Sequence, residues 1–262
     1  MAEPFRLSAF GGVYSNERAL AATLAEVAAR DTNETWCLGD LGGFGPHPDR
    51  AIEILRGAGV PSLRGNYDEA IGHGRPDCGC GYTDPRDERF AQLAYDYTAA
   101  RTAPEHREWM RTLPEHRRTE IGGRRVLLCH GSPRRVNEFL WESTCSDAFL
   151  EWLCETHAAD VLVCSHTGLP WHRALRSGRH VVNAGVIGRP ANDGRPGGSY
   201  AEITLGPEVQ VELRRVGYDH EAQARAMENE NLPAEFVETI RTGWWTTCLE
   251  NLPVQERRRG RH

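Results

Sequence analysis

The sequence predicts an α/β fold, and two observations carry this prediction. Four short apolar runs of strand length are bounded by Gly or polar turn residues: Thr35–Leu38, Val60–Leu63, Val126–Cys129 and Val161–Cys164. Between the first two runs, four apolar residues recur at helical spacing and predict a helix over Pro48–Gly57. A strand, a helix and a second strand in this order form the unit from which α/β sheets are built.

The later segments predict further elements. Apolar residues at helical spacing over Phe90–Leu113, with a break near Pro104, predict a helical layer. A Gly-Gly pair inside Glu120–Leu128 predicts a hairpin that leads into the third apolar run. Tyr200–Thr204 and Val209–Arg215 flank a Gly-Pro pair and predict a closing hairpin of a second sheet. We therefore expect two mixed sheets packed face to face, with helices outside.

A polar side chain follows each of the four apolar runs. These residues are Asp40, Asn66, His130 and His166. Because the carboxyl ends of parallel strands lie on one edge of a sheet, we expect all four on that edge. The Val60–Leu63 run is the weakest of the four, since Pro61 cannot donate a hydrogen bond to a neighbouring strand.

This set of side chains predicts a metal site. Carboxylate and amide oxygens together with imidazole nitrogens suit Mn, Fe or Zn better than Ca. The absence of cysteine among the four argues against a structural zinc site. A small phosphorylated substrate or ligand is a sensible partner for such a site.

The order of the motifs resembles that of the calcineurin-like metallophosphoesterase family, and more closely its small bacterial phosphodiesterase branch. The similarity runs from about Phe5 to Tyr218 and rests on Gly39-Asp40, Gly65-Asn66-Tyr67-Asp68, His130-Gly131-Ser132-Pro133, Ser165-His166-Thr167 and Asn183–Pro190. The resemblance implies a four-layer α-β-β-α sandwich with two mixed sheets. It also implies a metal-dependent hydrolase that acts on phosphomonoesters or phosphodiesters.

Two departures from the family pattern concern the metal ligands. The family usually opens with Asp-x-His-x-Asn after its first strand, whereas this chain has Gly12-Val13-Tyr14-Ser15-Asn16. Near the end, the second His of Gly-His-Thr-His is replaced by Gly168. The resemblance implies that one family metal keeps only Asp40 here, while the other keeps Asp40, Asn66, His130 and His166. We therefore predict a single divalent transition metal per chain, Mn, Fe or Zn.

Two tyrosines are candidates for a catalytic role. Tyr67 stands where many members of the wider family carry a His that protonates the leaving group, and a neutral tyrosine can still donate a hydrogen bond. Tyr14 occupies the altered first motif. It could hold a second metal, orient the phosphate, or line the pocket as an aromatic wall.

Three further residues are candidates for binding the substrate. Arg134 and Arg189 follow the motifs and could grip a phosphate with two hydrogen bonds, although solvated arginines would fit the same pattern. His172 lies four residues after Gly168 and could overhang the mouth of the site, or could be an ordinary loop residue.

Composition and length are typical of one globular unit. The chain has 262 residues, 39% hydrophobic and 26% charged, with a net charge of −6. We expect a metallophosphoesterase-like domain over residues 1–217, with a C-terminal extension over residues 218–262 packed on it. Glu221–Asn229 and Ala234–Arg241 are predicted to be helical within that extension.

Several other properties follow as expectations. No run approaches the ~18 apolar residues of a membrane span, and the first residues resemble no signal peptide, so we expect a cytoplasmic protein without membrane contact. The basic residues Arg257–Arg261 are expected to be a disordered terminus, and no nucleic-acid binding is predicted. The Trp244-Trp245 pair could pack on the core, cap the pocket or form a dimer contact, so a homo-oligomer is possible.

The eight cysteines do not form a disulfide framework. Cys37, Cys129 and Cys164 lie in apolar runs and are expected to be small core residues. Cys78-Gly79-Cys80 lies in a Gly-, Pro- and Asp-rich segment, Gly72 to Asp87, that is expected to be a long loop. This pair could bind a metal or form a redox pair, or the loop could cover the pocket and select the substrate.

Three functions remain open on sequence grounds. The first is a hydrolase of phosphate esters with one retained metal. The second is a degenerate relative that binds a metal or a phosphorylated ligand without turnover. The third is an enzyme with different chemistry at a single iron, since two His and one carboxylate are typical ligands of non-haem iron.

Overall fold

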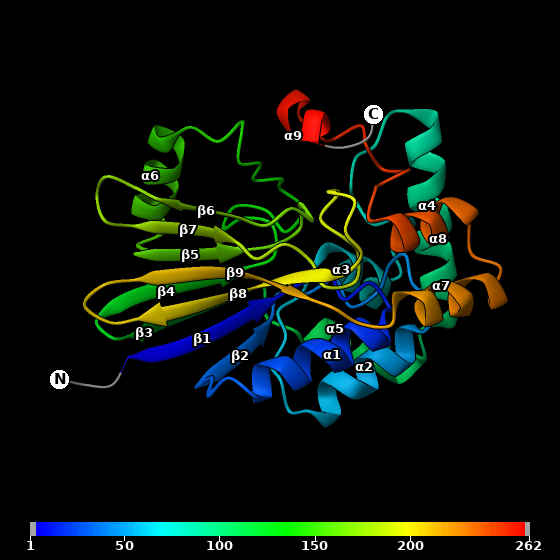
Figure 1. The fold of residues 1–262 in the computed structure, drawn as a ribbon, viewed down its shortest axis with the longest axis horizontal. Coiled ribbons are helices and arrows are strands. Elements are labelled where there is room, and N and C mark those ends of the chain that lie inside the picture. The colour runs from blue at the N-terminus through cyan, green and yellow to red at the C-terminus, as the bar shows by residue number, and fades with distance from the viewer. Residues whose placement is uncertain (1–3, 260–262) are drawn as a thin grey trace.

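The computed structural model, which describes residues 4–259, contains two mixed sheets packed face to face (Figure 1). The first sheet has the strand order β2-β1-β8-β9, with β1 Phe5–Phe10, β2 Glu34–Cys37, β8 Gly198–Leu205 and β9 Gln210–Val216. The second has the order β3-β4-β5-β7-β6, with β3 His116–Ile121, β4 Arg124–Cys129, β5 Val161–Cys164, β6 Trp171–Ala174 and β7 His180–Asn183. Parallel pairs join β1 to β2, β4 to β5 and β5 to β7, and the remaining pairs are antiparallel.

The central core lies between the sheets because alternate residues of each strand face opposite sides. Leu7 and Ala9 of β1 pack in one cluster with Val126 and Leu128 of β4, and Val163 of β5 belongs to the same cluster. The intervening residues face the outer helical layers. The chain therefore forms the four-layer α-β-β-α sandwich that the family resemblance implied.

The helices cover the outer faces of both sheets and one end of the molecule. Helices α1 (Glu17–Ala28) and α2 (Pro48–Gly57) pack with Phe10 and Tyr200 outside the first sheet, and α6 (Asp147–Thr156) packs with Leu127 and Leu162 outside the second. The remaining helices are α3 Asn66–His73, α4 Pro85–Arg101, α5 Pro104–Thr112, α7 His220–Asn229, α8 Ala234–Thr242 and α9 Val254–Arg259. Helices α4, α7 and α8 gather at the end toward which β1, β5 and β7 point (Figure 1).

Most of the predicted elements are confirmed. Helix α2 has the predicted bounds, the helical layer breaks between α4 and α5 next to Pro104, and the hairpins β3–β4 and β8–β9 form. The two helices predicted in the C-terminal extension are α7 and α8. The basic residues Arg257–Arg261 were expected to be disordered, but Arg257–Arg259 end helix α9, while Gly260 and Arg261 lie outside the described part of the chain. None of the described helices is long and apolar enough to cross a membrane.

Three expectations about local structure were wrong. The Val60–Leu63 run is no strand, since it forms only an isolated bridge between Cys37 and Ser62, as expected where Pro61 removes a backbone donor. The site residues do not share one sheet edge, because β2 belongs to the first sheet and β4 and β5 to the second. The segment expected as a loop from Gly72 to Asp87 includes the end of α3 and the first turn of α4, so the loop spans residues 74–84.

Candidate metal centre

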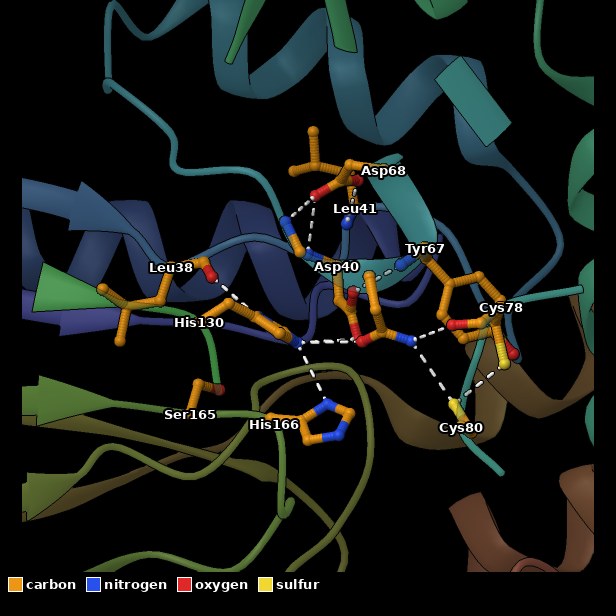
Figure 2. A network of polar contacts seen from close by, with 12 residues as sticks. Leu38, Asp40, Leu41, Tyr67, Asp68, Cys78, Cys80, His130, Ser165 and His166 are labelled. Carbon is orange, nitrogen blue, oxygen red and sulfur yellow. Dashed lines mark hydrogen bonds and ion pairs between the residues drawn. The ribbon is translucent and has the colours of Figure 1, made fainter. Parts of the chain in front are cut away.

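The imidazole of His130 lies at the centre of a buried cluster of four polar side chains (Figure 2). Its Nε2 lies 3.2 Å from Oδ2 of Asp40, 3.2 Å from Oδ1 of Asn66 and 3.1 Å from Nδ1 of His166. Its other ring nitrogen, Nδ1, lies 2.7 Å from the carbonyl oxygen of Leu38 and donates its hydrogen to it. In the neutral imidazole, Nε2 therefore presents a lone pair to two acceptor oxygens, and its contact with His166 Nδ1 is favourable only with a proton or a metal ion between the two nitrogens.

The amide of Asn66 is oriented by the loop that follows α3. Its Nδ2 donates to the carbonyl oxygen of Cys78 at 2.8 Å and lies 3.3 Å from Sγ of Cys80. With the amide nitrogen held there, the amide oxygen faces His130. The Cys78-Gly79-Cys80 segment thus positions a side chain of the cluster.

The carboxylate of Asp68 joins the two loops that carry Asp40 and Asn66 (Figure 2). It accepts hydrogen bonds from the backbone N–H groups of Asp40, Leu41 and Gly65, at 2.8, 3.0 and 2.8 Å. The backbone N–H of Tyr67 in turn donates to Oδ1 of Asp40 at 3.0 Å, which leaves Oδ2 facing His130. Asp68 was part of a sequence motif, but its role in holding the loops was not recognised.

Backbone strain is concentrated at the cluster. Asp40 has φ +57° and His166 has φ +65°, both in the left-handed region that non-glycine residues rarely adopt. Such conformations persist where the surrounding structure fixes them, and they are enriched at functional sites.

Electrostatics favour a positive charge in the cluster. Burial opposes the ionisation of Asp40, but the two imidazoles hold the pKa of its carboxyl below the usual value. Burial also opposes a charge on His130, but Asp40 raises its pKa. His166 is kept neutral, because burial and the neighbouring His130 lower its pKa to about 3. The cluster thus combines an ionised carboxylate, that of Asp40, with one imidazole that binds a proton readily and one that stays neutral.

The donor set fits a divalent transition metal. One ligand atom from each of Asp40, His130 and His166 lies within 4.8 Å of the others, and all three residues are buried. Asn66 adds an amide oxygen to the two nitrogens and the carboxylate, and this mixture suits Mn, Fe or Zn. The second ring nitrogen of His166, Nε2, is buried and has no hydrogen-bond partner among residues 4–259, so the ring can present either nitrogen to a bound group.

A pocket opens over this cluster. Seven aromatic side chains line it: Tyr14, Phe44, Tyr67, Tyr82, Phe139, Trp141 and Trp245. The Phe139 ring lies 4.2 Å from the ring of His166, centroid to centroid. Arg189 also lines the pocket, with its guanidinium between the rings of Phe44 and Trp245. Phe139 and Trp141 were not identified as site residues from sequence, because isolated aromatics in loops carry no periodic signal, whereas a place at the pocket was one of the three options for Trp245.

Of the five candidate catalytic and substrate-binding residues, three line the pocket and two do not. Tyr14, Tyr67 and Arg189 line the pocket. Arg134 does not: its guanidinium donates to Glu138 and stacks on Phe149 of α6. His172 does not line it either, because its Nε2 lies 3.0 Å from Nδ1 of His180 on the neighbouring strand.

Two glycines mark places where a side chain has no room. A Cβ at Gly12 would collide with Val186 and lie 3.0 Å from Cζ of Tyr14. A Cβ at Gly168 would lie 2.8 Å from the indole of Trp245. Both glycines have positive φ, +51° and +79°. Larger residues would therefore be strained as well as crowded.

Comparison with known proteins agrees with this fold. Residues 13–206 match the family model described as the calcineurin-like phosphoesterase superfamily domain. An uncharacterised protein of Methanocaldococcus jannaschii is 23% identical over 253 residues, which cover 90% of this chain and 98% of that protein. The crystal structure of a metallophosphoesterase from Sphaerobacter thermophilus is similar with a TM-score of 0.70 and 25% identity, covering 92% of this chain and all of that one.

A hypothetical protein from Pyrococcus horikoshii has the same fold, with a TM-score of 0.76, 20% identity and coverage of 92% of this chain and all of that one. The family match spans well over half of the 262 residues. It includes Asp40, Asn66, His130 and His166, which are brought together in the buried cluster. The chain therefore belongs to the calcineurin-like phosphoesterase superfamily.

Proposed function

We propose that the protein is a phosphoesterase that uses one divalent metal held by Asp40, Asn66, His130 and His166. The observation that carries this proposal is the contact of His130 Nε2 with a carboxylate oxygen, an amide oxygen and a second imidazole nitrogen, all within 3.2 Å. A carboxylate oxygen, an amide oxygen and an imidazole nitrogen around one ring nitrogen favour a cation, which a divalent metal ion or a proton on His130 would provide. A divalent ion in this place supplies Lewis-acid polarisation of a phosphoryl oxygen.

A single metal is supported by the surroundings of the altered motifs. Gly12 and Gly168 replace ligands of the family's other metal, and the space that their side chains would need contains Val186, Tyr14 and the Trp245 indole. Aromatic and aliphatic carbon is a poor environment for a divalent cation. The space beside the lost ligands is therefore occupied by apolar side chains rather than left open for a second metal.

The pocket residues would act on the phosphate group through hydrogen bonds and charge. Burial raises the pKa of both Tyr14 and Tyr67 well above the ordinary value, so both phenols stay protonated and can donate. Arg189 brings a positive charge into the pocket wall, and its Nη2 is fixed by the carbonyl oxygen of Thr247 at 2.7 Å. These three residues are the candidates for orienting the phosphoryl group.

The test combines metal counting with hydrolysis. The purified protein should contain about one Mn, Fe or Zn per chain by elemental analysis, and should release inorganic phosphate from a small phosphomonoester such as glycerol 1-phosphate once loaded. Asp40→Ala and His130→Ala should abolish both. His172→Ala is the matched control, because His172 lies outside the pocket, and it should retain both.

Each alternative outcome has a distinct meaning. One metal with tight phosphate binding and no turnover on any ester would favour a non-catalytic binding protein. Two metals per chain would contradict the single-site proposal. Hydrolysis that survives both Asp40→Ala and His130→Ala would exclude this cluster as the active site.

A further inference from the structure

Residues 244–252, near the C-terminus, form part of the pocket wall and are called the C-terminal strap. It contributes Trp245, Cys248 and Asn251 to the pocket lining. It contains no helix or strand, so other residues must hold it in place.

The strap is fastened by a buried carboxylate on α4. Asp87 is 5% exposed and accepts hydrogen bonds from three consecutive backbone N–H groups of the strap, those of Cys248 at 2.6 Å, Leu249 at 2.6 Å and Glu250 at 2.8 Å. A carboxylate with several backbone donors is a strong, charge-assisted anchor. The strap is therefore a fixed part of the pocket wall.

A second set of contacts ties the strap to the loop over residues 74–84. The Glu250 carboxylate accepts from the backbone N–H groups of Thr83 at 2.7 Å and Asp84 at 2.8 Å. Across the mouth, Nδ2 of Asn251 donates to the carbonyl oxygen of Cys80 at 3.3 Å. Strap and loop are thus joined, and both contribute residues to the pocket lining.

Trp245 carries the strap into the pocket. Its Nε1 donates to the carbonyl oxygen of Pro190 at 2.6 Å, and its backbone N–H donates to Oδ1 of Asn192 at 2.8 Å. Cζ of Arg189 lies 4.0 Å from the centroid of the Trp245 ring. The same ring fills the space beside Gly168. Trp245 is thus fixed by a hydrogen bond from its indole, a hydrogen bond from its backbone and the stacking of its ring on Arg189.

The space that remains is small. The cavity over the cluster has a volume of about 40 Å³. A cavity that accepts benzene measures about 150 Å³, and one water needs about 10–15 Å³. The enclosed part of the pocket is therefore suited to a group of a few atoms, such as a phosphoryl group, and the rest of a larger ester would have to extend past the wall that includes Trp245.

The charges around the pocket favour a dianion. Among the described residues that line it, Arg189 supplies the guanidinium and Asp40 the carboxylate, so with a divalent metal the centre carries a net charge of +2. A phosphomonoester carries close to two negative charges at neutral pH, and a phosphodiester carries one. Charge balance thus matches the monoester.

We propose that the substrates are phosphomonoesters of small alcohols, and that Trp245 on the C-terminal strap excludes larger ester groups. This inference rests on the proposed phosphoesterase activity. In the reaction, the oxygen of water bonds to phosphorus, the bond from phosphorus to the ester oxygen breaks, and the alcohol leaves with a proton. Trp245 acts as a specificity residue and takes no part in these bond changes.

The test compares two esters that release a primary alcohol, glycerol 1-phosphate and adenosine 5′-monophosphate. Their leaving groups are chemically similar, so their difference lies mainly in size. For the metal-loaded wild type, kcat/KM should be at least tenfold higher for glycerol 1-phosphate. Trp245→Ala should reduce this ratio at least fivefold, and Trp245→Phe should give an intermediate ratio, which keeps the test open if the alanine variant fails to fold.

A control and a second readout complete the design. Trp152 on α6 is 46% exposed and does not line the pocket, so Trp152→Ala should leave the ratio unchanged. Calorimetry on the metal-loaded protein should show inorganic phosphate binding at least tenfold tighter than adenosine 5′-monophosphate, with the preference reduced in the Trp245 variants.

The outcomes separate the two proposals. Equal or better turnover and binding of the nucleotide by the wild type would overturn the size restriction, as would an unchanged ratio in both Trp245 variants. If the wild type hydrolyses no ester, the phosphoesterase proposal fails, and the calorimetric preference alone decides whether the strap restricts size.

Discussion

Nε2 of His130 lies 3.1 Å from Nδ1 of His166, a contact between two imidazoles that is favourable only when a proton or a metal ion lies between them. The same Nε2 is 3.2 Å from the Asp40 carboxylate. A buried carboxylate beside two imidazoles favours a cation, either a proton on His130 or a metal ion. If a metal is held here, its binding is linked to the stability of the folded protein.

We expect a bound metal to stabilise the protein. A ligand present at 100 times its Kd stabilises the native state by about 2.7 kcal/mol when it does not bind the unfolded chain. The midpoint of thermal unfolding should rise when Mn or Zn is added and fall when a chelator removes it. His166→Gln should abolish the shift, whereas His172→Ala should preserve it. An equal shift in the His166 variant would mean that the metal binds elsewhere.

The second prediction concerns Asp68, which holds the loops that carry Asp40 and Asn66. In Asp68→Asn, one carboxylate oxygen becomes an NH₂ group that faces backbone N–H donors. We expect metal affinity to fall about 10- to 100-fold, as for other residues that orient ligands. Competition with a chelator measures this affinity. Asp31→Asn, at an exposed position with φ +49° that asparagine tolerates, is the control and should leave affinity unchanged.

The motifs allowed the cluster itself to be predicted, because each ligand follows a short apolar run or its turn. Asp40, Asn66, His130 and His166 could thus be found without knowing the sheet order. The expectation that all four lie on the edge of one sheet was wrong, because periodicity indicates which face of a strand is buried but not which strands are its neighbours. Arg189 was proposed as a phosphate ligand and lines the pocket, whereas Arg134 turns to Glu138, a local partner that the sequence does not distinguish from a substrate.

The pocket wall could not be predicted in the same way. Trp245 is separated by 55 residues from Pro190, whose carbonyl oxygen it contacts, and only the tertiary fold brings the two together. The Trp244-Trp245 pair left three placements open. The structure puts Trp245 in the pocket lining, packed with Trp141 and Leu252. Long-range contacts of loop residues of this kind leave no periodic trace in the sequence.

The third prediction concerns Gly65, which precedes Asn66 at the start of α3. A Cβ at this position would collide with Oδ1 and the backbone nitrogen of Asp40. Overpacking of this kind typically costs about 1–3 kcal/mol, so Gly65→Ala should lower the free energy of unfolding and weaken metal binding together. Denaturant titration and chelator competition measure the two effects.

Gly57 provides the matched control for this substitution. It ends α2, and a Cβ there would meet no atom within 4 Å. Gly57→Ala should be neutral or stabilising by up to about 1 kcal/mol, because alanine loses less backbone entropy on folding. If both alanine variants had the same stability and metal affinity, the close approach of Gly65 to Asp40 would carry no energetic weight.

The fourth prediction is a pH dependence far from the metal cluster, at the ion pair of Asp160 and Arg125. The Arg125 side chain donates to both carboxylate oxygens, at 3.0 and 2.7 Å, and these hydrogen bonds are the main cause that lowers the pKa of Asp160 to about 2. The unfolded chain has an ordinary Asp pKa of about 3.9. The folded state therefore binds fewer protons in this window. The stabilisation is fully present above about pH 4 and is lost as the pH falls toward 2.

Solvent limits the size of this effect, because the Asp160 side chain is 22% exposed. We expect Asp160→Asn to lower the free energy of unfolding by about 1 kcal/mol or less at pH 7. The difference from the wild type should shrink between pH 4 and pH 2, which urea titrations at several pH values can measure. Asp193 forms a more exposed ion pair with Arg215, so Asp193→Asn is the matched control. A difference at Asp160 that stays constant down to pH 2 would show that the ion pair does not stabilise the fold through the carboxylate charge.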